Sequence, residues 1–367
     1  MYVNDHWKNF APIERKWHFL IAFIYFVIGV VGFFTNFMVF YYLIRIKNVK
    51  RPGTYFLINL AIADIGKILA CLPMNAVSSF NAKWSFGQIG CDIYGLAGGL
   101  FGFVSITTMV FMSLERYLMV KNPLFALKIS NRTVFICILI TWIYSSACIF
   151  PQLTLKHGFV LEGLLTSCTF DYLDRDIYSR LFMMILFVAG FLVPNEITIM
   201  WMCQLMSVKR VQNQEVIFLK QIPTAQKILL NNNEFDYIKT DSECSNIYFN
   251  SSTFVKRELK VAKTVVVIVA MFCIAWLPYA IITLIAQYIS PKYLTSFINP
   301  LTTSLPAIFA KTSSIYNPIL YTLSNKDCKN YFRKLFVVRI LKLKKNKEVS
   351  NLKSEIRLTE HVHSLRN

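Results

Sequence analysis

The sequence predicts an all-α membrane protein: a bundle of seven transmembrane helices followed by an amphipathic helix on the cytoplasmic side. Three observations predict this fold. Of the 367 residues, 55% are hydrophobic and only 16% are charged, whereas a soluble domain has about 25% charged residues. The apolar residues form long runs, and basic residues gather between alternate runs, as they do in proteins that cross a lipid bilayer repeatedly.

Each apolar run is long enough to cross a hydrocarbon layer of about 30 Å at a rise of about 1.5 Å per residue. The seven runs cover residues 18–44, 54–80, 89–120, 133–154, 177–207, 261–288 and 299–323. The first run is too long for the apolar part of a cleavable signal peptide, so it is expected to be a transmembrane helix that acts as its own signal.

The basic residues predict the orientation. They gather in the loops after spans one and three, around span six and in the C-terminal tail, while the loops 81–90, 155–176 and 289–298 carry few. The positive-inside rule then predicts a multi-pass protein of the cell membrane with its N-terminus outside. This distribution also argues against nucleic-acid binding, although the net charge is +19.

The predicted organisation has four parts. An extracellular N-terminus (1–17) precedes the seven-helix domain (18–324), which contains a long polar cytoplasmic loop at about 208–254. A membrane-surface helix (325–337) and a basic cytoplasmic tail (338–367) follow. The nine cysteines show no metal-site spacing. Cys91 and Cys168 flank apolar runs on the outer face, where a disulfide can form.

One lysine is placed where a charge is costly. Lys311 lies twelve residues from both Asn299 and Leu323, so it should be about 18 Å from either end of span seven and near the bilayer midplane. A charged side chain there costs about 2.5–3.5 kcal/mol on insertion scales and marks a functional hypothesis. Two interpretations remain open: a structural ion pair, or condensation of the amine with an aldehyde.

Other polar residues fall within the spans. Asp64 in span two, Asn36 in span one and Asn317 in span seven can form one hydrogen-bonded cluster, with water or a sodium ion, or can simply join the helices. Lys67 lies three residues after Asp64, so it either pairs with that aspartate or faces a cavity. The pattern gives no account of Glu196.

These residues belong to stretches that resemble rhodopsin-type G-protein-coupled receptors across all seven spans. The stretches are GFFTN (Asn36), NLAIAD (Asp64), Cys91 at the head of span three, LERY (Glu115, Arg116, Tyr117), Trp142, Pro194, AWLPY (Trp276, Pro278, Tyr279) and NPILY (Asn317, Pro318, Tyr321). Their order, span by span, makes the resemblance specific.

Within that class the chain resembles opsins, closest to invertebrate rhabdomeric, melanopsin-like or divergent non-visual members. The stretch IFAKTSSIYNPILY carries the lysine that links retinal in that family, here Lys311. LEGLLTSCTFDY resembles the second extracellular loop, in which Glu162 matches the counterion of the protonated Schiff base. Tyr94 stands where vertebrate visual opsins place a glutamate. The implied cofactor is retinal, 11-cis in the dark and all-trans after light.

The resemblance also implies a pocket and a switch. Trp276 and Tyr279 are expected to line the pocket, Gly98 and Gly102 to make room for the ligand, and a Cys91–Cys168 disulfide to hold Glu162 over it. A nearby carboxylate is needed because an apolar pocket would otherwise strip the proton from the Schiff base. At the cytoplasmic end Arg116 is expected to pair with Glu115, with Glu258 joining in.

The expected function is that of a photoreceptor that activates a heterotrimeric G protein, possibly of the Gq type, and not that of an enzyme. Further expected partners are arrestin, a receptor kinase and the lipid bilayer. The sequence differs from the family pattern in two places: Met202 replaces a tyrosine, and Asn325, Lys326 and Asp327 replace a His-Pro-Lys-like stretch. A retinal photoisomerase with weak signalling and a receptor for a diffusible ligand therefore remain alternatives.

Overall fold

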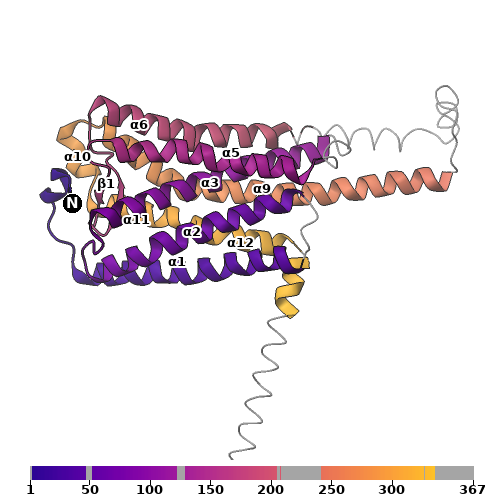
Figure 1. The fold of residues 1–367 in the computed structure, drawn as a ribbon, viewed down its shortest axis with the longest axis horizontal. Coiled ribbons are helices and arrows are strands. Elements are labelled where there is room, and N and C mark those ends of the chain that lie inside the picture. The colour runs from indigo at the N-terminus through magenta and orange to yellow at the C-terminus, as the bar shows by residue number, and fades with distance from the viewer. Residues whose placement is uncertain are drawn as a thin grey trace, which may run out of the picture. The chain divides into compact units, whose positions relative to one another are not determined.

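Long helices lie side by side over most of the chain (Figure 1). The structure is a computed structural model, and it describes residues 2–46, 52–121, 129–204, 207, 241–325 and 327–334. The chain divides into two compact units, Met1–Leu320 and Tyr321–Asn367. The first unit holds the helical bundle and the candidate site, and the second is described by itself below.

The helices follow the predicted spans closely. In chain order the elements are η1 (Asp5–Asn9), α1 (Arg15–Tyr41) with the π-helical η2 (Tyr42–Ile46), α2 (Pro52–Phe80), α3 (Gly87–Lys121), α5 (Asn131–Ile149) with η3 (Phe150–Thr154), α6 (Ile177–Phe187) with the π-helical η4 (Val188–Leu192), α9 (Asp241–Tyr288), α10 (Pro291–Phe297), α11 (Pro300–Lys311) and α12 (Ser313–Ser324). Among the described residues, six helices are long and apolar enough to cross a membrane.

The seventh span is built from two helices. α11 and α12 contain 12 residues each, which together reach about 36 Å at 1.5 Å per residue, enough to cross the bilayer. They are separated by a turn at Thr312, directly after Lys311. The Thr312 backbone N–H bonds the Phe309 carbonyl at 3.1 Å, a tight 3₁₀-type bond that ends the first helix.

The predicted loop at about 208–254 is wrong at its C-terminal end, because α9 begins at Asp241 and continues for 48 residues. Residues 208–240 lie outside the described residues. The stretch Asp241–Phe254 is polar but contains neither Gly nor Pro, so it can extend the helix. Polarity alone therefore does not distinguish a loop from a helix.

The second unit contains a helix at residues 327–334, within the predicted membrane-surface helix. Asn325 caps this helix, since its side-chain oxygen accepts from the backbone N–H groups of Asp327 and Cys328, both at 3.1 Å. Residues 335–337 and the tail 338–367 lie outside the described residues.

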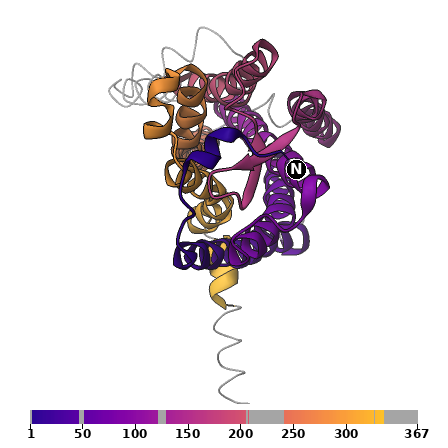
Figure 2. The ribbon, with the colours of Figure 1, turned by 90° about the vertical axis from the view of Figure 1, so that its left-hand side faces the viewer.

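A short hairpin crosses one end of the bundle. β1 (Phe159–Glu162) pairs antiparallel with β2 (Ser167–Phe170), in a register that places Leu161 opposite Cys168 and Glu162 opposite Ser167. Figure 2 shows the two strands lying within the ring of helices, near the N-terminal segment. The predicted disulfide between Cys91 and Cys168 is present and ties β2 to the start of α3.

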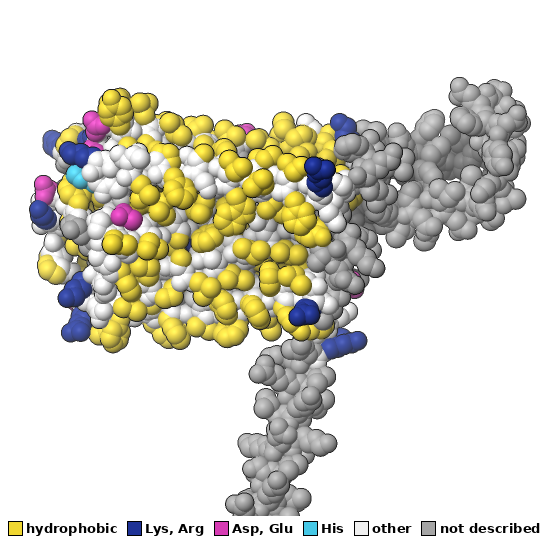
Figure 3. All heavy atoms as spheres, viewed as in Figure 1, with side chains coloured by type: hydrophobic (Ala, Val, Ile, Leu, Met, Phe, Trp, Pro, Cys, Tyr) yellow, Lys and Arg dark blue, Asp and Glu magenta, His cyan; other side chains and the backbone are white. Residues whose placement is uncertain are grey.

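The surface of the bundle carries the apolar side chains expected of a face in contact with lipid. Phe23, Ile143 and Leu69 are 64%, 60% and 57% exposed, while Asn36 and Asp64 are each 1% exposed. Figure 3 shows hydrophobic side chains over the middle of the visible face and most of the charged ones at its ends. This arrangement suits a hydrocarbon layer, because apolar side chains can face lipid tails without a free-energy penalty. Polar groups must instead find hydrogen-bond partners inside the protein.

Gly95 brings the hairpin into close contact with α3. A Cβ atom at this position would lie 2.0 Å from a ring carbon of Phe159 on β1, and Phe159 is itself buried. At Gly98, one turn further along the same helix, a Cβ atom would meet its nearest neighbour, the Cys71 sulfur, at an ordinary 3.6 Å. The absence of a side chain at residue 95 therefore lets β1, and Glu162 at its end, lie over the bundle.

We predict that Gly95→Ala destabilises the protein although alanine favours helix. The clash with Phe159 should cost about 1–3 kcal/mol and outweigh the gain in helix propensity of about 0.5–1 kcal/mol. Thermal unfolding of the purified protein should show a lower Tm for Gly95→Ala, whereas Gly98→Ala, the matched control on α3, should equal or exceed wild type. Equal Tm values for the two variants would contradict the close contact.

Candidate functional site

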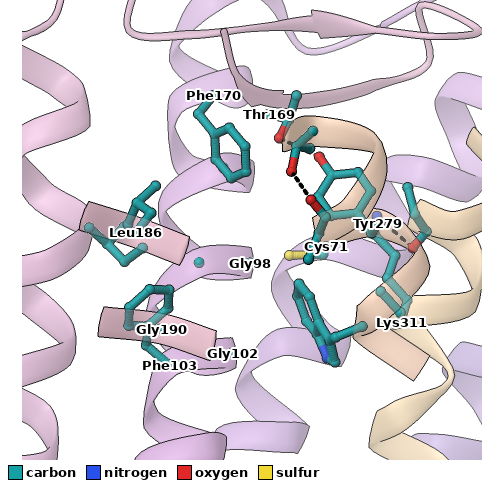
Figure 4. Close-up of a pocket in the computed structure, with 18 of the residues that line it drawn as sticks. Cys71, Gly98, Gly102, Phe103, Thr169, Phe170, Leu186, Gly190, Tyr279 and Lys311 are labelled. Atoms are coloured by element: carbon teal, nitrogen blue, oxygen red, sulfur yellow. Dashed lines mark hydrogen bonds between the residues drawn. The ribbon is translucent and has the colours of Figure 1, made fainter. Parts of the chain in front are cut away.

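A cavity lies inside the bundle, beneath the hairpin (Figure 4). The space open to the centre of a water molecule is about 180 Å³, whereas a single water needs about 10–15 Å³ of such space. The cavity can therefore hold an organic ligand of many atoms. Its walls are mainly apolar and aromatic, and include Ile106, Phe103, Phe187, Phe191, Phe272 and Leu186.

Lys311 reaches into this cavity from the last position of α11 (Figure 4). Its Nζ lies 3.5 Å from the Ala307 carbonyl oxygen, 5.6 Å from the ring centre of Tyr94 and 5.9 Å from that of Tyr25. No ion pair joins Lys311 to a carboxylate of the described residues within 4.0 Å. The arrangement does not support a structural ion pair and leaves an amine facing an apolar cavity.

Glu162 is the carboxylate that faces the same cavity, and it is only 2% exposed. Its Oε2 accepts hydrogen bonds from the Tyr279 hydroxyl at 3.1 Å and the Tyr172 hydroxyl at 3.4 Å, and its Oε1 accepts from the Ser167 hydroxyl at 3.5 Å. Burial raises the pKa of the Glu162 carboxyl, and the charge of Lys311 and the hydrogen bond from Tyr279 oppose this rise.

The other predicted pocket residues also line the cavity. Tyr94 is buried and its hydroxyl accepts from the Asn75 amide at 2.9 Å. The Trp276 indole N–H donates to the Ser313 hydroxyl at 3.3 Å. Gly98 and Gly102 leave room on α3, and a Cβ at Gly102 would touch the Trp276 ring at 3.6 Å. The structure therefore places the predicted pocket residues together, while their roles stay predictions.

Several cavity residues are not predicted by the sequence analysis. Cys71, Phe103, Phe170, Leu186 and Gly190 all line the cavity. Apolar periodicity separates lipid-facing positions from inner ones, but it does not separate a packed core from a cavity wall. For Lys67 both expected alternatives hold, because it pairs with Asp64 and also lines the cavity, where it is a second amine besides Lys311.

The intramembrane polar residues form contacts that differ in part from the predicted cluster. The Asn317 amide donates to Asp64 Oδ2 at 2.8 Å, and Lys67 Nζ lies 3.5 Å from Asp64 Oδ1. Asn36 joins the helices differently, because its amide donates to the backbone carbonyls of Gly32 and Ser314, each at 2.8 Å. The cation beside Asp64 in the structure is thus a side chain of the protein.

The predicted pair of Glu115 and Arg116, near the C-terminal end of α3, is present. Arg116 Nη2 donates to Glu115 Oε1 at 2.6 Å, and Tyr117 packs on Trp201 with ring centres 4.9 Å apart. Glu258 belongs to α9, but its side chain lies outside the described part of the structure. Met202, the departure from the family pattern, is buried in the same hydrophobic cluster as Tyr117.

The remaining switch residues lie on α12. Pro318 interrupts the backbone hydrogen bonding inside that helix. In the second unit, the Tyr321 hydroxyl accepts from the Asn325 amide at 2.9 Å. Glu196 is exposed on the bundle surface, and nothing in the structure explains a carboxylate there.

Comparison with known proteins agrees with this geometry. The family described as "7 transmembrane receptor (rhodopsin family)" matches residues 35–321. The chain is 33% identical over 342 residues to "Rhodopsin, GQ-coupled" of Mizuhopecten yessoensis, covering 93% of this chain and 63% of that protein. It is 34% identical over 325 residues to a rhodopsin of Enteroctopus dofleini, covering 88% and 66%. The chain thus spans slightly less than two thirds of each of these relatives.

A solved structure shows the same fold. The crystal structure of squid rhodopsin superimposes with a TM-score of 0.79 at 28% identity, covering 93% of this chain and 91% of that one. The expected seven-helix fold is confirmed, and with it a protein that crosses a membrane several times. The chain belongs to the rhodopsin family of seven-transmembrane receptors and, within it, to the opsins.

Proposed function

We propose that this protein is a photoreceptor that holds retinal covalently on Lys311 and activates a heterotrimeric G protein of the Gq type when illuminated. The observation that carries the proposal is the pair of groups facing one apolar cavity: the Lys311 amine, without a carboxylate in contact, and the buried Glu162 carboxylate. The name of the Mizuhopecten relative, which is described as Gq-coupled, supports the choice of G protein.

The residues present suit retinal. When bound, retinal supplies an aldehyde that condenses with an amine and a polyene that light isomerises from 11-cis to all-trans. Trp276, Tyr279 and Phe170 offer aromatic surface to such an apolar molecule. Lys311 offers an amine that faces the apolar cavity without a carboxylate in contact, and a lysine amine can form a Schiff base with a carbonyl compound.

The second amine of the cavity is held back from the same reaction. Lys67 lies 3.5 Å from Asp64, and both side chains are almost fully buried. The Lys67 nitrogen is engaged by this ion pair and by the Ser313 hydroxyl oxygen at 3.5 Å, so it is not free to attack an aldehyde. The selectivity for Lys311 therefore follows from the distribution of carboxylates around the two lysines.

Glu162 serves to keep a proton on the Lys311 nitrogen. Its negative charge is itself stabilised by the hydroxyl groups of Tyr279, Tyr172 and Ser167, since hydrogen bonds to a charged group are worth about 1.5–3 kcal/mol each. The carboxylate can thus remain ionised although burial alone would favour its neutral form. A cation held on this nitrogen would draw the absorption toward visible light.

Trp276 is placed to pass a change of ligand shape to α9. Its ring lines the cavity and stacks on Phe272 at a centre distance of 5.8 Å. Pro278 lies inside α9 two residues later and weakens the helix there by removing a backbone hydrogen bond. We propose that the ligand pushes on Trp276 and the kinked α9, and that breaking the Arg116–Glu115 latch lets α9 swing outward and open the G-protein site, a two-state change biased by the ligand.

The remaining expectations complete the proposal. The N-terminus and the hairpin face the exterior, as the loop charges indicate, and arrestin and a receptor kinase bind the opposite end. One alternative has a specific observation in its favour: Met202 stands where the family resemblance implies a tyrosine. It favours a retinal photoisomerase with weak signalling.

We predict that the protein given 11-cis-retinal shows a visible absorption band and that Lys311→Ala shows none. Among the residues that the structure describes, Lys67 is the other amine on the cavity wall, and its ion pair with Asp64 keeps it from condensing. The measurement is an absorption spectrum of purified protein, with Lys292→Ala, a lysine outside the cavity, as the control that keeps the band. A visible band in Lys311→Ala would contradict the proposal.

We predict that Glu162→Gln moves the dark band into the ultraviolet at neutral pH. An amide cannot stabilise a positive charge on the Lys311 nitrogen, so that nitrogen loses its proton in the apolar cavity. Asp171→Asn is the matched control, since Asp171 belongs to the same loop but bonds the backbone N–H groups of Leu173 and Asp174. Its band should stay visible. An unshifted band in Glu162→Gln would assign the counterion role to another acid.

We predict that illumination of the retinal-bound protein speeds guanine-nucleotide exchange on a Gq-type protein. Exchange should remain at the dark rate in Lys311→Ala, which provides the control. If light turned over retinal without changing nucleotide exchange, the photoisomerase alternative would replace the receptor.

A further inference from the structure

Two opposite charges are buried side by side on α2, and one of them, that of Lys67, lines the cavity that the proposed function uses. Asp64 is 1% exposed and Lys67 is 4% exposed. Their charged atoms, Oδ1 and Nζ, are 3.5 Å apart and lie three residues apart in sequence, on one face of the helix. Burying a carboxylate without a compensating positive charge is costly, so the stability of the bundle depends on the source of that charge.

The surroundings of Asp64 leave one oxygen to the lysine. Oδ2 accepts the Asn317 amide at 2.8 Å, whereas Oδ1 accepts no hydrogen bond from the described residues that meets the usual geometry. The Ser314 hydroxyl lies beside the same carboxylate, but among the described residues it makes no hydrogen bond that meets the usual geometry. Ionic contact with Lys67 is therefore the interaction that compensates Oδ1.

Lys67 also contacts the break in the seventh span. Its Nζ lies 3.5 Å from the hydroxyl oxygen of Ser313, the first residue of α12, and 6.0 Å from the ring centre of Trp276. The same Ser313 oxygen accepts the indole N–H of Trp276 at 3.3 Å. One ammonium group thus lies between a carboxylate on α2, a hydroxyl on α12 and an indole on α9.

We propose that Lys67 is a built-in cation: it supplies the positive charge that the buried Asp64 would otherwise take from a dissolved sodium ion. The ammonium fills the position where a small cation would meet the Asp64 carboxylate and the oxygen of Ser313. It cannot dissociate, so the stability of the protein does not depend on sodium. Removal of the amine leaves room beside a carboxylate and a hydroxyl. These two groups offer the oxygen ligands that hard cations prefer. The inference does not depend on retinal.

The test uses the full-length protein without retinal, so its outcome is separate from that of the proposed function. Tm is measured in sodium chloride and in choline chloride at equal ionic strength. Wild type should give the same Tm in both salts. Lys67→Met should have a lower Tm in choline chloride and should gain a few degrees as sodium is added, in a saturable manner, because an ion that binds only the folded state raises its stability.

Two further variants make the test specific. Lys67→Arg retains the cation and should remain indifferent to sodium. In Asp64→Asn/Lys67→Met the carboxylate is absent, so the sodium response seen in Lys67→Met should vanish. Folding of Lys67→Met in sodium chloride but not in choline chloride would also support the proposal.

Four results would overturn it. In the first, the Tm of wild type itself rises saturably with sodium. In the second, Lys67→Met is as stable as wild type and its Tm does not depend on sodium, which would mean that Asp64 carries no charge needing compensation. Lys67→Met could fail to fold in either salt while the double variant folds, so that sodium cannot replace the ammonium. Failure of the double variant as well would show that Lys67 is needed for something other than the charge of Asp64.

Discussion

An ammonium group inside a hydrocarbon layer must be paired, hydrated or consumed by a reaction, because its charge is otherwise too costly to bury. Two lysines of this protein face that constraint in one cavity, and the structure resolves them differently. Lys67 is paired with Asp64, while Lys311 faces apolar and aromatic side chains without a carboxylate in contact. The chemistry we propose follows from this difference, since a carboxylate holds the Lys67 amine and no carboxylate contacts the Lys311 amine.

The position of Glu162 depends on contacts that lie far apart in the sequence. The Cys91–Cys168 disulfide ties β2 to α3, and Gly95 lets Phe159 of β1 lie directly against the same helix. The carboxyl at the end of β1 then meets the Tyr279 hydroxyl of α9 at 3.1 Å. Loop and bundle together therefore hold a buried carboxylate near Lys311 without bringing the two into an ion pair. That separation keeps the amine available.

The sequence was sufficient for the helical spans and the unusual position of Lys311, because long apolar runs and charges inside them are local signals. The disulfide was expected from the family resemblance and from the position of the two cysteines beside apolar runs. Three other features could not be predicted from the sequence, for physical reasons. The turn at Thr312, directly after Lys311, could not be predicted, because threonine does not usually end a helix in the way that glycine or proline does. The polar start of α9 was interpreted as a loop because polarity reports solvent contact. The role of Lys67 depends on Ser313 and Trp276, which approach α2 only in the folded bundle.

The covalent link to Lys311 can be located directly. Protein incubated with 11-cis-retinal in the dark is illuminated, treated with borohydride to reduce the carbon–nitrogen double bond to a stable amine, digested and analysed by mass spectrometry. The peptide that contains Lys311 should carry the added retinyl mass, and the peptide that contains Lys67 should be unmodified. A retinyl group on Lys67, or on neither lysine, would contradict the assignment of Lys311 as the reactive amine.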